Sequence, residues 1–160
     1  QPVLMTLLSP LAGTLSDRVE PRIVATWGMG LTTLGLFLFI FLGRSTPVAL
    51  IIADLALLGL GFALFSSPNN NAVMGSVSPP LYGVASSALG TMRLVGQAMS
   101  MAIVTLVMSL IMGSASLQAS APLLLQASRI TFIIFTITCF VGIFASLNRG
   151  NINRPVRQEV

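Results

Sequence analysis

The stretch IVATWGMGLTTLGLFLFIFLG, residues 23–43, decides the fold class of this protein. None of its side chains is charged, and apolar residues occupy most of its positions. The hydrocarbon core of a bilayer is about 30 Å thick, so a helix of roughly 20 apolar residues crosses it. This stretch has that length without interruption and therefore predicts a transmembrane helix.

The composition of the whole chain points to the same class. Of its 160 residues, 54% are hydrophobic and 8% are charged, and the mean hydropathy is +0.92. A soluble domain carries about 25% charged residues, and a disordered chain has low hydrophobicity, so both classes are excluded. The Arg residues behind the net charge of +4 are scattered or terminal, so we expect no nucleic acid partner. With no His and one Cys, we expect no metal site, disulfide or cofactor.

Further apolar runs occupy residues 48–67, 83–112 and 130–147. Residues 1–12 look like the end of a span whose beginning is missing, and the chain opens at Gln1 without an initiator methionine, so we expect it to be part of a longer protein. The sequence therefore predicts an all-α integral membrane protein. Its transmembrane region, residues 1–147, contains four complete helices and the end of a fifth, and a polar tail follows over residues 148–160.

The placement of arginine predicts the orientation, because cytoplasmic loops are enriched in positive residues. One predicted side of the membrane has five Arg residues and the other has two. The five are Arg18, Arg22, Arg149, Arg154 and Arg157, and the two are Arg44 and Arg129. We therefore expect the loop over residues 13–22, the connector over residues 68–82 and the C-terminal tail to lie on the cytoplasmic side of the cell membrane.

Two charged residues, Asp54 and Arg93, lie inside predicted spans. Such a group near the bilayer centre costs about 2.5–3.5 kcal/mol on insertion scales, so it normally faces a bundle interior or water. At about 1.5 Å of rise per residue, their heights in the membrane differ by only about 5 Å, so a pair is geometrically possible. Asp54 is a candidate for proton coupling or cation binding. The alternative is a hydrated group near the external interface.

The helix that carries Arg93 has a polar and small face. Helical spacing places five residues on this face, namely Ser86, Gly90, Arg93, Gln97 and Ser100. One interpretation is that Arg93 and Gln97 line a polar cavity. The alternative is that small residues let helices approach closely, with Arg93 as a tether. The candidate packing residues are Gly83, Ser86, Gly90 and Gly96.

The loop GTLSDRVEPR, residues 13–22, is the most informative motif. On spacing alone it is a helix hairpin in which Asp17 can cap the following helix. It also resembles the cytoplasmic signature of the major facilitator superfamily, Gly-x-Leu-x-Asp-Arg-x-Gly-Arg-Arg/Lys. The matching residues are Gly13, Leu15, Asp17, Arg18 and Arg22, while Glu20 and Pro21 depart from the pattern. The resemblance implies that Gly13, Asp17, Arg18 and Arg22 form a conformational gating loop.

A second resemblance points to one branch of this superfamily. Residues 67–77 (SPNNNAVMGSV) and 83–98 (GVASSALGTMRLVGQA) are similar to the end of the fourteen-helix drug:proton antiporters of the EmrB/QacA type. This likeness implies a C-terminal fragment of a proton-coupled efflux carrier that works by alternating access. The implied partners are the lipid bilayer, the missing N-terminal helices, protons, and a small hydrophobic or cationic drug.

Two other functions stay open at this point. One is a major facilitator carrier for a metabolite, and the other is a membrane scaffold subunit that transports nothing. An enzyme is not expected, because the chain has no His and no paired carboxylates inside its spans. Sequence upstream of Gln1 separates carrier from scaffold, since a carrier requires many more helices.

Overall fold

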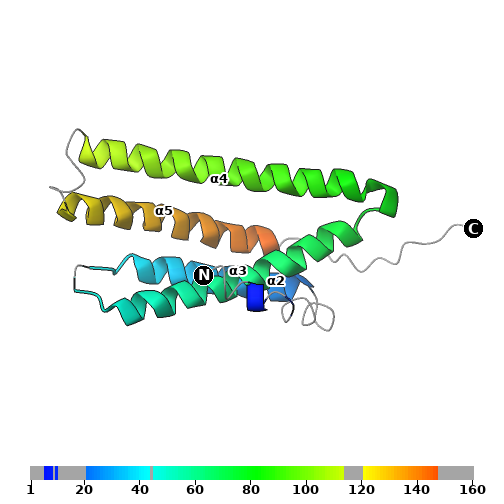
Figure 1. Cartoon of the computed structure of the whole chain (residues 1–160), viewed down its shortest axis with the longest axis horizontal. Helices are drawn as coiled ribbons and strands as arrows, with labels where there is room; N and C mark the ends of the chain where they lie inside the picture. Colours follow the sequence, from blue (N-terminus) through cyan, green and yellow to red (C-terminus); the bar gives the residue numbers. More distant parts are fainter. Residues whose placement is uncertain (1–5, 9, 11–20, 44, 114–120, 148–160) are drawn as a thin grey trace, which may run out of the picture.

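A computed structural model describes residues 6–8, 10, 21–43, 45–113 and 121–147. Its main elements are the helices α2 (Pro21–Phe39), α3 (Val48–Gly75), α4 (Tyr82–Met112) and α5 (Ala121–Leu147), with a short 3₁₀ turn η1 (Pro79–Leu81) before α4. Every regular element in these ranges is helical (Figure 1). The predicted all-α fold class is confirmed.

Three helical stretches are long and apolar enough to cross a membrane: Val48–Gly75, Pro79–Met112 and Pro122–Leu147. The shortest has 26 residues, so it extends about 39 Å and exceeds a hydrocarbon core of about 30 Å. The apolar stretch of α2, Ile23–Phe39, is shorter. The chain therefore has the helices of a multi-pass membrane protein.

Helix α2 ends at Phe39 rather than at Gly43, where the apolar run ends. The backbone tightens there, because the N–H of Ile40 donates to the carbonyl of Phe37 at 3.1 Å, three residues back. The N–H of Gly43 donates instead to Oγ1 of Thr46 at 2.9 Å. A polar side chain in the loop thus takes a donor that would otherwise continue the helix.

Helix α3 continues to Gly75, beyond the expected end of the span at residue 67. Pro68 lies inside the helix and is fully buried. Proline removes one backbone donor, but membrane helices tolerate this loss where neighbouring groups compensate. Likewise α5 begins at Ala121, nine residues before its predicted span. The helices thus extend past the predicted spans, and where the membrane boundaries fall stays a prediction.

Helix α2 packs against both α3 and α5, and α4 packs mainly against α5. Helices α3 and α4 meet near the turn that joins them and then diverge, so the two are separated along most of their length (Figure 1). The two helices therefore form an angle that is narrowest at their junction (Figure 1).

The contact between α2 and α3 is a backbone contact through glycines. A Cβ placed on Gly28 would lie 2.6 Å from the backbone nitrogen of Phe65 and 2.7 Å from the carbonyl oxygen of Gly61. A Cβ on Gly61 would lie 2.6 Å from Oγ1 of Thr32. Membrane helices associate through this kind of close approach, because lipid supplies no hydrophobic driving force between them.

The contact between α2 and α5 is made by side chains. The rings of Phe39 and Phe132 stack with centroids 5.0 Å apart. Nearer the other end of α2, the hydroxyl groups of Thr26 and Ser146 hydrogen bond at 3.2 Å. These contacts place α2 at the centre of the described bundle.

Candidate functional site

Asp54 lies between α2 and α3, with its carboxyl group against the backbone of α2. Only 8% of the residue is exposed. A Cβ placed on Gly35 of α2 would lie 3.3 Å from Oδ1 of Asp54. Within the described part of the chain, this oxygen has no hydrogen-bond partner. The structure therefore holds an acid between two helices at a point where α2 has no side chain.

The neighbours of Asp54 at this point are apolar. Leu58, one turn further along α3, is 7% exposed, and its Cδ2 lies 2.7 Å from the same Cβ position on Gly35. A buried polar group without a partner is costly, and a charged one in a membrane helix more so. Among the described residues, Oδ1 of Asp54 therefore makes no structural hydrogen bond. The role of Asp54 in proton coupling stays a prediction.

Arg93 and Gln97 are both exposed on α4. Arg93 contributes to a hollow of about 370 Å³ in the angle between α3 and α4, near their junction. The hollow is lined by Asn70, Met74, Ser86, Leu89, Gly90 and Arg93. Gln97 is not among these residues, so this hollow holds Arg93 without Gln97.

The structure does not bring Asp54 and Arg93 together. Asp54 faces Gly35 of α2, whereas Arg93 faces the hollow between α3 and α4. No ion pair between them occurs among the described residues. The α3 residues beside Arg93 begin at Asn70, which lies 16 residues after Asp54, about 24 Å along the helix.

The small residues of α4 are not packed by the described helices. A Cβ placed on Gly83, Gly90 or Gly96 would meet no described atom within 4 Å. Ser86 is exposed as well. The helix-packing role expected of these four residues therefore has no partner in the described chain and stays a prediction.

The proposed gating loop lies largely outside the described residues. Gly13, Asp17 and Arg18 fall in the undescribed range 11–20. The backbone of Arg22 belongs to the first turn of α2, and its side chain is not described. Their gating role therefore stays a prediction.

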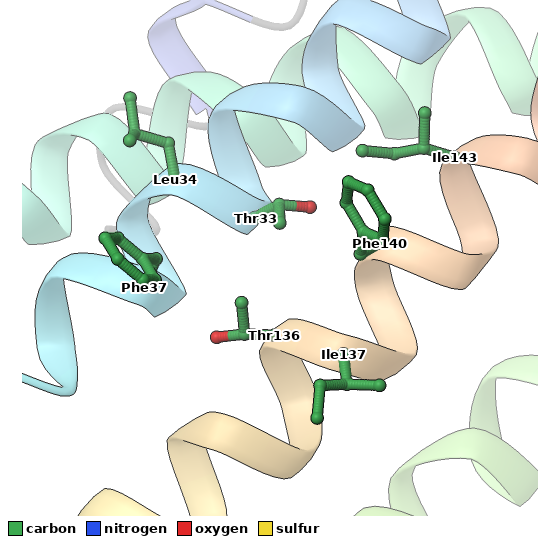
Figure 2. A pocket seen from close by; sticks show the side chains of 7 residues that line it. All are labelled: Thr33, Leu34, Phe37, Thr136, Ile137, Phe140 and Ile143. Carbon is green, nitrogen blue, oxygen red and sulfur yellow. The ribbon is translucent and has the colours of Figure 1, made fainter.

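A second concavity, of about 480 Å³, lies between α2 and α5 (Figure 2). Its lining is Thr33, Leu34, Phe37, Thr136, Ile137, Phe140 and Ile143. Both threonine hydroxyls donate within their own helices, Thr33 to the carbonyl of Met29 at 2.8 Å and Thr136 to that of Phe132 at 2.7 Å. This groove therefore presents an apolar surface and no free donor for recognising a polar ligand.

Sequence reasoning missed the residues that define the tight contact between α2 and α3. Gly28 and Gly35 are seven residues apart, so they share one face of α2. That spacing indicates a packing face on α2. The opposing Gly61, however, lies in a run of Leu, Gly and Ala that shows no single packing face. The sequence also did not single out Asn70 and Met74 as neighbours of Arg93, because they belong to the expected connector.

Three relatives place the chain among membrane transporters. The uncharacterized transporter YebQ of Escherichia coli K12 is 37% identical over 108 residues, which are 68% of this chain and 24% of that protein. The riboflavin transporter RibZ of Clostridioides difficile is 36% identical over 92 residues, 58% of this chain and 20% of that protein. The multidrug resistance protein Stp of Mycobacterium tuberculosis is 30% identical over 99 residues, 62% of this chain and 18% of that protein.

The chain thus spans about a quarter or less of the length of these relatives. No solved structure matches it. The sequence profile of the Major Facilitator Superfamily matches residues 2–158, nearly the whole chain. This match, the long apolar helices and the transporter relatives agree, and the chain belongs to the Major Facilitator Superfamily, whose members are transporters.

Proposed function

We propose that this chain forms the C-terminal part of a proton-coupled carrier that exports hydrophobic or cationic drugs across the cell membrane. The similarity to Stp, a multidrug resistance protein, supports export of drugs. The proposed partners are the bilayer, further helices of the same transporter, protons and the exported compound. The orientation proposed from the arginine distribution keeps the C-terminal tail in the cytoplasm.

The observation that carries the proposal is the position of Asp54. Its carboxyl group lies between two helices that touch backbone to backbone, and Oδ1 has no partner among the described residues. Gain or loss of a proton there changes the charge that the contact between α2 and α3 must accommodate. Such a local change of charge can bias one conformation of a transporter over another. Alternating access then follows from movement of two helical halves around a central site.

A metabolite carrier is the second candidate. It is favoured by the similarity to RibZ, a riboflavin transporter, which is 36% identical over the matched residues. The two candidates share the fold and the coupling site, and they differ in the compounds that the full-length transporter moves.

The test uses the full-length transporter in everted membrane vesicles that hold a preformed proton gradient. A fluorescent pH probe reports whether each compound of a panel of hydrophobic dyes, drugs and riboflavin dissipates the gradient. Dissipation by several unrelated compounds, absent from vesicles that lack the protein, is the expected result. A response to riboflavin alone would replace the drug exporter by the metabolite carrier. No response to any compound would overturn proton-coupled export.

A further inference from the structure

The hollow between α3 and α4 has the shape of a small binding site. Asn70 and Met74 are four residues apart on α3, and Ser86, Leu89 and Arg93 recur at spacings of three and four on α4. Each set therefore lies on one face of its helix. The two faces meet where the helices diverge from their junction, and they border a half-open hollow of about 370 Å³, a volume near the lower end of known ligand pockets, roughly 300–1,000 Å³.

The polar side chains of this hollow are mainly hydrogen-bond donors. Arg93 offers five N–H groups in a fixed fork, and the amide of Asn70 offers two more. Ser86 adds a hydroxyl, while Met74 and Leu89 give the hollow apolar surface. A ligand that fits this lining has a compact group of acceptor oxygens attached to an apolar body.

The charge of the hollow is positive. Arg93 is the one ionisable residue among the six that line it. The acidic residue of α3, Asp54, lies 16 residues before Asn70, which is about 24 Å along the helix. It also packs against Gly35 of α2. Among the described residues, nothing therefore neutralises Arg93, and a cation placed in the hollow would be repelled.

Resting on the proposed function, we propose that the hollow between α3 and α4 binds amphipathic organic anions, with the anionic group on Arg93 and Asn70 and the apolar body on Met74 and Leu89. The family resemblance implies hydrophobic or cationic drugs, and this proposal narrows them to hydrophobic compounds that carry an anionic group. Guanidinium groups bind carboxylates and sulfonates through paired, charge-assisted hydrogen bonds. The flexible thioether of Met74 suits apolar bodies of varied shape.

The test measures equilibrium binding of three dansyl probes to the purified full-length transporter, without a proton gradient. The probes share one fluorophore: dansylglycine is anionic, dansylglycine amide is neutral, and dansylethylenediamine is cationic. The parent is expected to bind the anion most tightly and the cation most weakly. Arg93→Gln should weaken binding of the anion by about 10- to 100-fold, the size typical of a lost charged hydrogen bond, and leave binding of the amide nearly unchanged.

Two further variants make the result specific. Arg93→Lys keeps the charge but loses the fork, so it should retain part of the preference for the anion, and it serves as the test if Arg93→Gln does not fold. Arg129→Gln is the matched control, because Arg129 is exposed on α5 and does not line the hollow. Equal or tighter binding of the cation by the parent, or equal effects of Arg93→Gln and Arg129→Gln, would overturn the site.

These outcomes separate the two proposals. Anion binding that depends on Arg93, without any proton response in vesicles, would support the proposed anion site and refute proton-coupled export. A proton response to cations, without anion binding, would support proton-coupled export and refute the proposed anion site.

Discussion

Replacing Gly28 by Ala should separate α2 from α3, because the added methyl group meets backbone atoms that cannot rotate away. The new Cβ would lie 2.6 Å from the nitrogen of Phe65 and 2.8 Å from the carbonyl carbon of Leu64, whereas ordinary contact begins at 3.4 Å. The helices must therefore move apart by about 0.8 Å at this point. Overpacking costs about 1–3 kcal/mol, and the better helix propensity of Ala returns about 0.5–1 kcal/mol. The net loss of stability is therefore between about 0 and 2.5 kcal/mol.

The assay is thermal unfolding of the full-length transporter in detergent, followed by size-exclusion chromatography. Gly30→Ala, also on α2, is the matched control, since a Cβ there meets no described atom within 4 Å. We expect a lower melting temperature for Gly28→Ala and an unchanged or slightly higher one for Gly30→Ala. The double variant Gly28→Ala/Gly61→Ala should lose less than the sum of its single variants, because one separation of the helices relieves both clashes. A Gly28→Ala protein as stable as the Gly30→Ala protein would refute the backbone contact.

Three other expectations follow from the packing and the orientation. Gly142→Ala should cost little, because the new Cβ meets only a flexible methionine methyl group at 2.7 Å. Thermal unfolding checks this, and a loss as large as that of Gly28→Ala would contradict it. A double-mutant cycle of Phe39→Leu and Phe132→Leu should give a coupling of about 0.5–1.5 kcal/mol for the stacked rings, and zero coupling would mean that the rings do not interact. An impermeant maleimide should label Ser76→Cys only from the cytoplasmic side and Ser45→Cys only from outside, and the reverse pattern would invert the proposed orientation.

The fold class was predictable because a membrane imposes strong rules on sequence. A helix must be long and apolar to cross the hydrocarbon core, and the uncharged run from Ile23 shows this directly. The burial of Asp54 followed from the same rule, since an acid in such a run avoids lipid. The sequence could not show that its carboxyl group faces Gly35, because periodicity gives the face of one helix and not the partner opposite.

The ends of the helices were less predictable. Pro68 normally ends a helix, but here α3 continues through it to Gly75. The proline is fully buried within the protein, and membrane helices tolerate proline where neighbouring groups compensate for the lost donor. The early end of α2 is likewise set by the loop, where Thr46 binds the N–H of Gly43. Neither effect appears in the hydropathy of the sequence.

The polar face of α4 was recognised from its spacing, but its environment was not. Arg93 was expected to point into the protein, and in the described chain it lies exposed at the rim of a hollow with Asn70 and Met74. Those two residues belong to a part of α3 that the sequence predicts to be a connector between helices. Their proximity to Arg93 depends on the angle between α3 and α4, which the sequence does not encode in any local pattern.

The central claim is that Asp54 couples protons to transport, and Asp54→Asn tests it most directly. Full-length protein in proteoliposomes is assayed with whichever dye gives the largest proton response in the parent. We expect Asp54→Asn to abolish accumulation driven by a proton gradient but to retain exchange of the dye without a gradient, and Asp54→Glu to keep part of the accumulation. Gradient-driven accumulation by Asp54→Asn equal to that of the parent would contradict the account.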